Sequence, residues 1–321
     1  MVMQPLTKLL YRLLESYLVV IGAALLWGLF FPSQAVVLAP YLTFFLQGIF
    51  FFAGLKLDIK EVGRQFRHPL RILLANAFML VIFPLVAYPV TRYFYPDAAV
   101  GVMLLAAMPT ALSTPLFASL VGGSEALAIV LTTTSSLVAP FTIPLVIALT
   151  VGQKVAINSS EIFYSLALVI FLPLFLAQLV RRLVRLQVQA ASFTYKPISV
   201  LLLGLIVAGS TPKYADEILA NFNVTLVPIL LVLFIFSLAS HVVGYLTAFH
   251  RSQAEKVTYT ISLAYMSFVI AIYLAEKFFP DPKTILTVVL EIIPWTLLFV
   301  PFRLWALRRI KQGQPPSAAI T

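Results

Sequence analysis

Hydroxyl side chains and prolines gather in one apolar stretch, residues 106–144, which reads AAMPTALSTPLFASLVGGSEALAIVLTTTSSLVAPFTIP. Pro109 and Pro115 remove backbone donors, and the carbonyl groups freed in this way need a protein or water partner because hydrocarbon offers none. A broken helix flanked by hydroxyls at membrane depth is the usual layout of a solute or ion site in secondary transporters. The stretch therefore predicts a binding site.

The candidate binding residues of this stretch form two groups. One lies at the proline break and the other follows it, and together they are Pro109, Thr110, Ser113, Thr114, Thr132, Ser135 and Ser136. The spacing i, i+3, i+4 places the last three on one helix face, so they can turn toward the break together. The simpler alternative for any single hydroxyl is a hydrogen bond to the carbonyl four residues earlier in its own helix.

Composition sets the protein class. The chain has 321 residues, of which 61% are hydrophobic and 11% charged, whereas a soluble domain carries about 25% charged residues. A span takes roughly 20 apolar residues, so there is room for about ten. We expect an all-α polytopic membrane protein. The absence of cysteine excludes disulfides and thiolate chemistry.

Apolar runs predict spans near residues 17–38, 41–56, 70–91, 98–121, 124–150, 161–180, 195–212, 222–248, 257–278 and 284–306. With both termini cytoplasmic, 17 of the 22 lysines and arginines fall inside, as expected for a plasma or bacterial inner membrane. The same bias accounts for the net charge of +10. Membrane lipids, and not nucleic acid, are therefore the expected partners.

Ten spans divide into two inverted repeats of five, because an odd number reverses the direction of the second set. We expect the first repeat in residues 1–156, the second in 157–311, and a disordered tail in 312–321. The counterpart of broken span four is span nine, residues 257–278, which contains neither glycine nor proline. On composition alone it could cross without being unwound. Its candidate binding residues are Ser262, Tyr265 and Ser267.

Three segments resemble the bile acid:sodium symporter family: GLKLDIKEVGRQFRHP at 54–69, the 106–144 stretch, and IFLPLFLAQLVRRL at 170–183. The order and spacing of the spans also agree. The resemblance implies a panel of spans 1, 2, 6 and 7 that rocks against a core of spans 3–5 and 8–10. Broken helices 4 and 9 would cross near the midplane. It further implies alternating-access transport of a small organic anion or similar solute.

The residues depart from this family where sodium would bind. Positions that resemble the family's Gly-Gly-Thr-Ala-Ser-Asn motif read PTALST at 109–114, and its Glu-x-Gly-x-Gln motif corresponds to SLAYM at 262–266. Met79 stands where a glutamine is expected. Sodium binding requires several oxygen ligands, preferably with one formal negative charge nearby. Na⁺ is the only cofactor that the resemblance implies, and we expect transport to depend weakly on sodium or not at all.

Glu291 is an acidic residue at membrane depth, and His241 in span eight is its candidate titratable partner. Burying a charged acid costs about 2.5–3.5 kcal/mol on insertion scales, so such a residue is a functional candidate by default. A proton-coupling role is one interpretation. The alternative is that a neutral Glu291 hydrogen-bonds a core hydroxyl while His241 caps a carbonyl.

Several function classes stay open. A secondary transporter is favoured, with a proton-coupled or uncoupled facilitator or efflux carrier as a variant. The lost sodium ligands also leave open a non-transporting sensor or assembly subunit that retains a transporter fold. An enzyme is disfavoured, because membrane transferases usually need paired acids or a His-Asp arrangement. Neither the solute nor the oligomeric state is determined, and a monomer would suffice.

Overall fold

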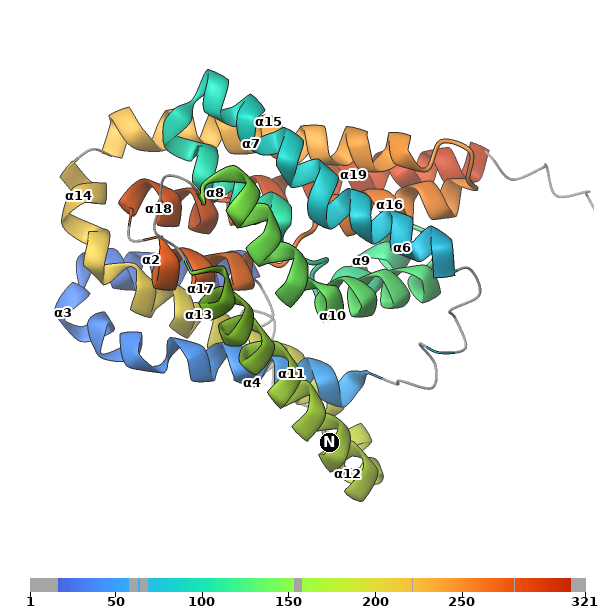
Figure 1. The fold of residues 1–321 in the computed structure, drawn as a ribbon. Coiled ribbons are helices and arrows are strands. Elements are labelled where there is room, and N and C mark those ends of the chain that lie inside the picture. The colour runs from blue at the N-terminus through green and yellow to red at the C-terminus, as the bar shows by residue number, and fades with distance from the viewer. Residues whose placement is uncertain are drawn as a thin grey trace, which may run out of the picture.

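The structure is a computed structural model that describes residues 17–57, 63, 69–152, 158–220, 222–279 and 281–312, and within these ranges it is helical without strands (Figure 1). Seven of the described helices are long and apolar enough to cross a membrane, and Val19–Phe30 and Pro96–Ala107 are shorter apolar helices. The predicted all-helical, multi-pass class is confirmed. The predicted disordered tail lies outside the described residues, apart from Gln312, which ends the last helix.

The first part of the chain alternates long helices with short or interrupted ones. Its elements are α2 (Tyr17–Phe30), α3 (Pro32–Ala35), η1 (Val36–Tyr41), α4 (Leu42–Lys56), α6 (Pro69–Ala77), η2 (Phe78–Ile82), α7 (Phe83–Phe94), α8 (Pro96–Ala107), α9 (Thr114–Leu120) and α10 (Glu125–Thr150). The N-cap of α10 is Ser124, whose hydroxyl accepts a hydrogen bond from the Leu127 N–H. The start of this long helix is thus set by local sequence.

The second part repeats this alternation. Its elements are α11 (Ser159–Leu183), α12 (Arg185–Ala190), α13 (Ser192–Ser210), η3 (Pro212–Tyr214), α14 (Ala215–Ala220), α15 (Phe222–Thr247), α16 (Gln253–Ala264), α17 (Phe268–Phe278), α18 (Pro282–Leu290) and α19 (Ile292–Gln312). Ser252 and Glu255 form a reciprocal capping box at the start of α16. Such a box satisfies two of the amides that a helix start leaves without partners.

One predicted boundary is wrong. The sequence suggested a connector at Ala39-Pro40, whereas the first helix ends at Phe30 and a new one begins at Pro32. Phe31 leaves helical geometry, with φ −129° and ψ 53°, as expected for a residue that precedes proline. Pro40 lies inside the 3₁₀ helix η1. The second predicted span therefore begins earlier than expected, at Pro32.

The suggestion that span nine crosses without being unwound is also wrong. The helix stops at Ala264 and resumes at Phe268, although the segment holds neither glycine nor proline. The break in span four is as predicted, between Ala107 and Thr114. The residues of the second break do not explain it, so contacts with another segment must.

The helices pack as two groups. In one group α4 packs on both α11 and α13, and α13 also packs on α2. In the other group α15 packs on α16, α7 and α18 pack on α8, and α10 packs on α9 and α16. The groups meet where α17 packs on α4 and α13, and where α11 packs on α10, the helix that precedes it in the chain. The largest apolar core lies mainly in the second group and extends across this junction.

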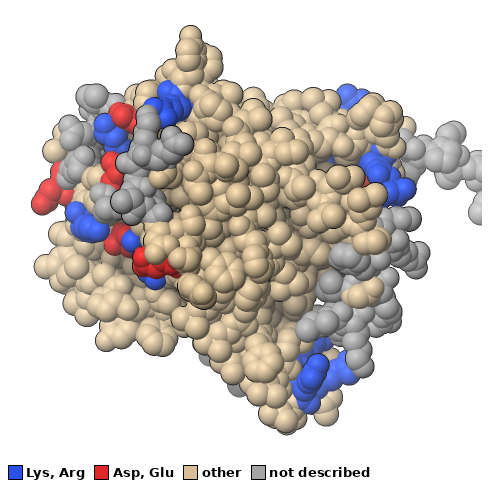
Figure 2. Space-filling view, viewed as in Figure 1, with Lys and Arg blue, Asp and Glu red and all other residues tan. Residues whose placement is uncertain are grey.

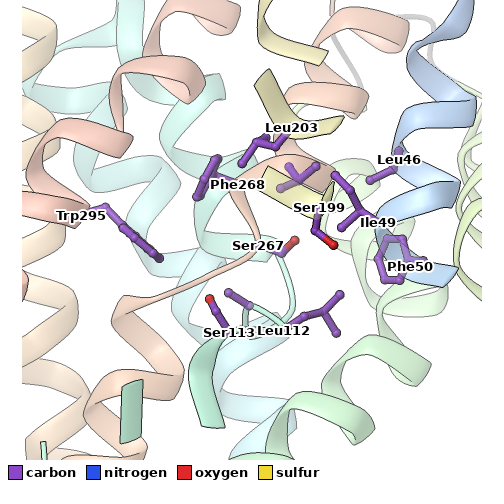
Figure 3. Close-up of a pocket in the computed structure, with 12 residues that line it drawn as sticks. Leu46, Ile49, Phe50, Leu112, Ser113, Ser199, Leu203, Ser267, Phe268 and Trp295 are labelled. Atoms are coloured by element: carbon purple, nitrogen blue, oxygen red, sulfur yellow. The ribbon is translucent and has the colours of Figure 1, made fainter. Parts of the chain in front are cut away.

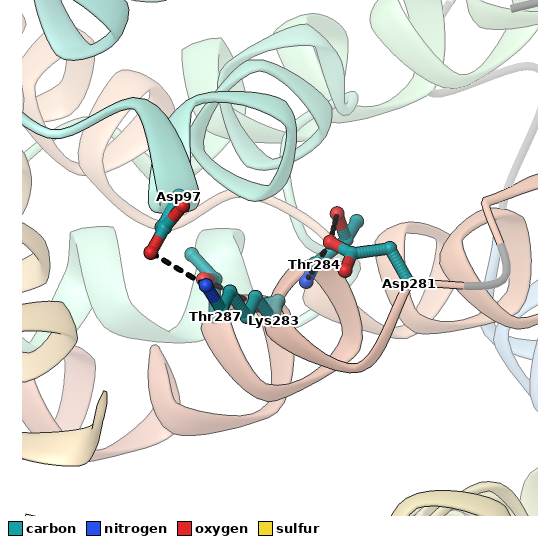
Figure 4. A network of polar contacts seen from close by, with 5 residues as sticks. All are labelled: Asp97, Asp281, Lys283, Thr284 and Thr287. Atoms are coloured by element: carbon teal, nitrogen blue, oxygen red, sulfur yellow. Dashed lines mark hydrogen bonds and ion pairs between the residues drawn. The ribbon is translucent and has the colours of Figure 1, made fainter. Parts of the chain in front are cut away.

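Helices α8 and α18 approach each other closely at Gly101. A Cβ atom at this position would lie 2.5 Å from the Cβ of Thr287, so no larger residue fits without movement. Lys283 donates to Asp97 across the same pair of helices at 2.7 Å, as Figure 4 shows. Both side chains are about half exposed, and a pair of this kind contributes about 0–1 kcal/mol. Close packing, rather than the ion pair, therefore holds these helices together.

Charged side chains on the face seen in Figure 2 gather toward opposite ends of the molecule and leave an uncharged region between them. Many large apolar side chains are exposed, such as Phe44 at 70% and Phe175 at 69%. A soluble protein rarely exposes such a continuous apolar surface. The uncharged region is where the hydrocarbon of a bilayer would lie.

Candidate functional site

The two helix breaks meet each other inside the protein. The Ala111 N–H donates to the carbonyl oxygen of Tyr265 at 2.9 Å, and the Ser267 N–H donates to the carbonyl oxygen of Pro109 at 2.8 Å. Thr110 and Met266 thus pair as an antiparallel bridge. Each break supplies partners for backbone groups that the other has freed from helical bonding. This is how irregular backbone is tolerated at membrane depth.

Side-chain hydroxyls extend this crossing into α10 and α16. Thr110 Oγ1 donates to the carbonyl oxygen of Ser262 at 3.0 Å, and the Thr110 N–H donates to Ser135 Oγ at 3.2 Å. Ser135 Oγ in turn donates to the carbonyl oxygen of Thr132 at 3.1 Å. All of these residues are buried. The crossing is therefore part of a polar cluster shared by the first break, α10 and α16.

Most of the predicted hydroxyl residues lie inside the protein, and Ser113 is half-buried. Thr110, Thr114, Thr132, Ser135, Ser136, Ser262, Tyr265 and Ser267 are all buried. Among the described residues, Thr132 Oγ1, Ser262 Oγ and the Tyr265 hydroxyl have no hydrogen-bond partner. Buried polar atoms without partners are costly, and such atoms mark places where water, an ion or a solute can bind.

A cavity of about 60 Å³ lies between the crossing and the helices α4 and α13 (Figure 3). Ser113, Ser199 and Ser267 are its hydroxyl residues, and no charged side chain lines it. The remaining lining residues are apolar: Leu46, Ile49, Phe50, Ala111, Leu112, Leu203, Phe268, Val269 and Trp295. This volume holds only a few water molecules. A larger solute would need α4 and α13 to move away from the crossing.

The cavity uses only part of the predicted residue set. Ser113 and Ser267 line it, whereas the other predicted residues do not: Pro109, Thr110, Thr114, Thr132, Ser135, Ser136, Ser262 and Tyr265. Ser199 was not predicted. Its hydroxyl donates to the Tyr195 carbonyl at 2.8 Å in its own helix, so nothing in its local sequence distinguished it from an ordinary helical serine.

Glu291 lies at the junction of α18 and α19, next to the helix interruption that Pro294 favours. It is 4% exposed, and Ser237 Oγ donates to its Oε1 at 2.5 Å. His241 Nδ1 donates to the Ser237 carbonyl at 2.7 Å. The acid thus hydrogen-bonds a core hydroxyl while the histidine caps a carbonyl, as one of the two sequence interpretations predicted. Glu291 does not line the cavity, although Trp295 one turn later does.

Asn76 is a buried polar residue that the sequence analysis missed. Its Nδ2 donates to Thr134 Oγ1 at 2.7 Å, and its Oδ1 has no partner among the described residues. It lies two residues before η2, one turn of π-helix, a feature frequent at functional sites. A lone asparagine in the apolar run LLANAFMLVIF was the available signal. Met79, which stands where the family resemblance implies a glutamine, is buried in the apolar core.

The described residues contain no group of three or more His, Cys, Asp or Glu side chains that could hold a metal ion. The oxygens gathered at the crossing are neutral hydroxyls and carbonyls. They could contribute to a weak alkali-cation site, but they lack the formal charge that offsets cation desolvation. The donor set therefore fits sodium poorly.

Comparison with known proteins identifies the family of the chain. The family model for the SBF-like CPA transporter family matches residues 15–304. The chain is 26% identical to the uncharacterized sodium-dependent transporter YocS of Bacillus subtilis, over 72% of this chain and 70% of that protein. It is 24% identical to the probable sodium/metabolite cotransporter BASS5 of Oryza sativa subsp. indica, over 90% and 75%.

A further relative is sodium/bile acid cotransporter 7-B of Xenopus laevis, 23% identical over 69% of this chain and 67% of that protein. The names of these relatives describe transporters of the kind that the sequence resembles. Because the family model covers almost the whole chain, the protein is an integral, multi-pass member of the SBF-like CPA transporter family, divergent within the bile acid:sodium symporter group.

Proposed function

We propose that the protein is a secondary transporter that moves a small organic anion or a similar solute by alternating access. The observation that carries this proposal is the pair of backbone hydrogen bonds between Pro109–Ala111 and Tyr265–Ser267. Two discontinuous helices that meet beside a cavity are the usual construction of a transporter binding site. The named relatives are sodium/metabolite and sodium/bile acid cotransporters.

The proposed architecture has ten spans in two inverted repeats. Counting α2, α3 to α4, α6 to α7, α8 with α9, and α10 gives five spans. Counting α11, α13, α15, α16 with α17, and α18 with α19 gives five more. The group of α2, α4, α11 and α13 would be the panel, and the remaining spans the core. Both termini would be cytoplasmic, in accord with the basic residues of the connecting segments.

Recognition of an anion would depend on backbone dipoles rather than on lysine or arginine, since no charged side chain lines the cavity. Helix α17 begins at the cavity, and Ser267, Phe268 and Val269 contribute to its wall. A helix N-terminus carries a partial positive charge and free N–H groups, which favour an anionic ligand group. The apolar wall residues would contact the rest of an amphipathic solute.

Coupling is the part of the proposal in which the chain departs from its relatives. The neutral oxygens near the crossing favour weak or absent sodium dependence. Glu291 is a buried carboxyl that could bind and release a proton. Ser237 links it to His241, because the Ser237 hydroxyl donates to Glu291 and the Ser237 carbonyl accepts from His241. Reversible protonation of Glu291 could therefore couple transport to protons. An uncoupled facilitator is the competing outcome.

Uptake into proteoliposomes would test these proposals. A panel of labelled carboxylates and sulfonates would be offered under a sodium gradient, a proton gradient, or neither. We expect saturable uptake that changes little with sodium, and loss of any proton dependence in Glu291→Gln. The matched control is Glu125→Gln, which replaces a first-turn acid of α10 away from this cluster.

Each result of this experiment separates two alternatives. Strong sodium dependence that survives Glu291→Gln would restore ordinary sodium symport and exclude the proton proposal. Absence of uptake for the whole panel, with correctly folded protein, would favour a non-transporting sensor or assembly subunit. Uptake without any ion dependence would identify a facilitator.

A further inference from the structure

A second and larger cavity, of about 460 Å³, is lined by residues from the last turns of α4 and α11, from α12 and from the start of α13. None of its lining residues belongs to the two helix breaks. Lys56 and Arg181 line it together with the polar residues Gln189 and Ser192 and the aromatic residues Phe193 and Tyr195. We propose that this cavity binds the phosphate headgroup of one anionic phospholipid. The proposal is independent of the transported solute.

The walls of the cavity are fixed by hydrogen bonds. The Tyr195 hydroxyl donates to the Val188 carbonyl at 2.8 Å, which joins α13 to α12. Gln178 Nε2 donates to the Gly54 carbonyl at 2.7 Å, and Arg181 donates to the Leu57 carbonyl, so α11 is joined to the end of α4. The Phe52 and Tyr195 rings lie 5.5 Å apart beneath the cavity. The site is therefore built before any ligand arrives.

The side chains that line the cavity include two cations, Lys56 and Arg181, and no acid. Arg182 and Arg185 lie next to Arg181 in the chain, and residues 162–215 include no aspartate or glutamate at all. In Figure 2 blue side chains gather at the projecting lower end of the molecule. A basic pocket at the end of membrane helices is the expected environment of an acidic headgroup.

Exposed apolar side chains next to these cations indicate a lipid rather than a free phosphate. Leu183, Leu186 and Phe193 are 74%, 78% and 65% exposed. The end of α11 and the whole of α12 project beyond the rest of the molecule (Figure 1). Basic residues beside exposed leucine and phenylalanine are typical of segments that lie in the membrane interface. Acyl chains of the bound lipid would contact these side chains.

The test measures lipid retention by the full chain in detergent, by native mass spectrometry during titration with phosphatidylglycerol. Removing a charge near an acidic surface weakens binding about fivefold, so the double variant Lys56→Gln, Arg181→Gln should bind about 25-fold more weakly than the parent. Arg181→Lys keeps the charge and should bind like the parent within about threefold. The control pair Arg308→Gln, Arg309→Gln alters exposed cations at the end of α19 and should have no effect.

Two further ligands distinguish the source of the phosphate. Phosphatidylcholine and soluble glycerol phosphate should both bind at least about tenfold more weakly than phosphatidylglycerol. Equal retention of phosphatidylglycerol by the double variant would overturn the proposal, as would equal binding of phosphatidylcholine. Glycerol phosphate that binds as tightly as the lipid would show a site for free phosphate and would overturn the lipid assignment. Thermal unfolding without added lipid checks that every variant is folded.

Discussion

The two helix breaks reach the same place by different routes. The break between α8 and α9 contains Pro109 and is followed by Pro115, so its own sequence prevents a continuous helix. The break between α16 and α17 consists of ordinary residues, Tyr265 to Ser267. The comparison shows that a broken helix can be imposed by a partner segment as well as by proline.

Partner contacts explain the second break. At its C-terminal end α16 passes into Tyr265, with φ −109° and ψ 69°, and its carbonyl accepts the Ala111 N–H. The Tyr265 ring is fully buried, with ring centroids 5.0 Å from Trp295 and 5.6 Å from Phe117. Backbone pairing and aromatic burial together offset the helical hydrogen bonds lost at this position. The first break supplies the partners of both backbone hydrogen bonds, Ala111 and Pro109, so the second break depends on the first.

Tyr265→Ala should have the largest effect. It removes the fully buried ring that anchors the second break, and truncation of a buried aromatic residue costs about 3–5 kcal/mol. We expect a large loss of thermal stability in detergent and loss of uptake. Tyr265→Phe is the control, because the hydroxyl has no partner among the described residues and its removal should cost less than about 1 kcal/mol. Equal effects of the two changes would show that the ring is not the anchor.

Ser267→Pro should have the next largest effect. The φ of −78° at this position suits proline, yet the substitution removes the N–H that donates to the Pro109 carbonyl. A buried carbonyl without a donor costs about 1–3 kcal/mol, and uptake should fall at least about tenfold. Ser267→Ala keeps the N–H and should unfold near the parent temperature. If both variants behave like the parent, pairing between the breaks is not what maintains them.

Thr110→Val tests the side-chain contribution to the same crossing. Valine has nearly the shape of threonine but cannot donate to the Ser262 carbonyl, so we expect a loss of about 1–2 kcal/mol. Thr142→Val is the control, because that hydroxyl bonds only the Val138 carbonyl within its own helix. Chemical unfolding of both variants would measure the difference. A larger effect at Thr142 would contradict the assignment of Thr110 to the crossing.

Pro109→Ala should have the smallest effect. The pairing with Ser267 uses the carbonyl of residue 109, which alanine also provides, and Pro115 still follows the break. The break should therefore persist, with a stability change of about 1 kcal/mol or less. Hydrogen exchange at residues 108–113 would report whether the segment has become helical. New strong protection there, or an effect exceeding that of Ser267→Pro, would mean that proline alone maintains the first break.

The sequence by itself determined the features that depend on local chemistry. Apolar runs specify an all-helical membrane protein, Pro109 and Pro115 specify the first break, and the spacing of Thr132, Ser135 and Ser136 places them on one buried face. Each of these follows from a single residue's backbone or from helical periodicity. The family resemblance was also readable at this level, because the motifs are contiguous.

Only the tertiary structure decided the features that need a second segment. The break at Tyr265, the cavity position of Ser199, the pairing of Glu291 with Ser237 and the burial of Asn76 each depend on a residue far away in the chain. A serine or an acid in an apolar run does not indicate which helix will pack against it. In hydrocarbon every polar group must find a protein partner, and folding alone brings that partner into place.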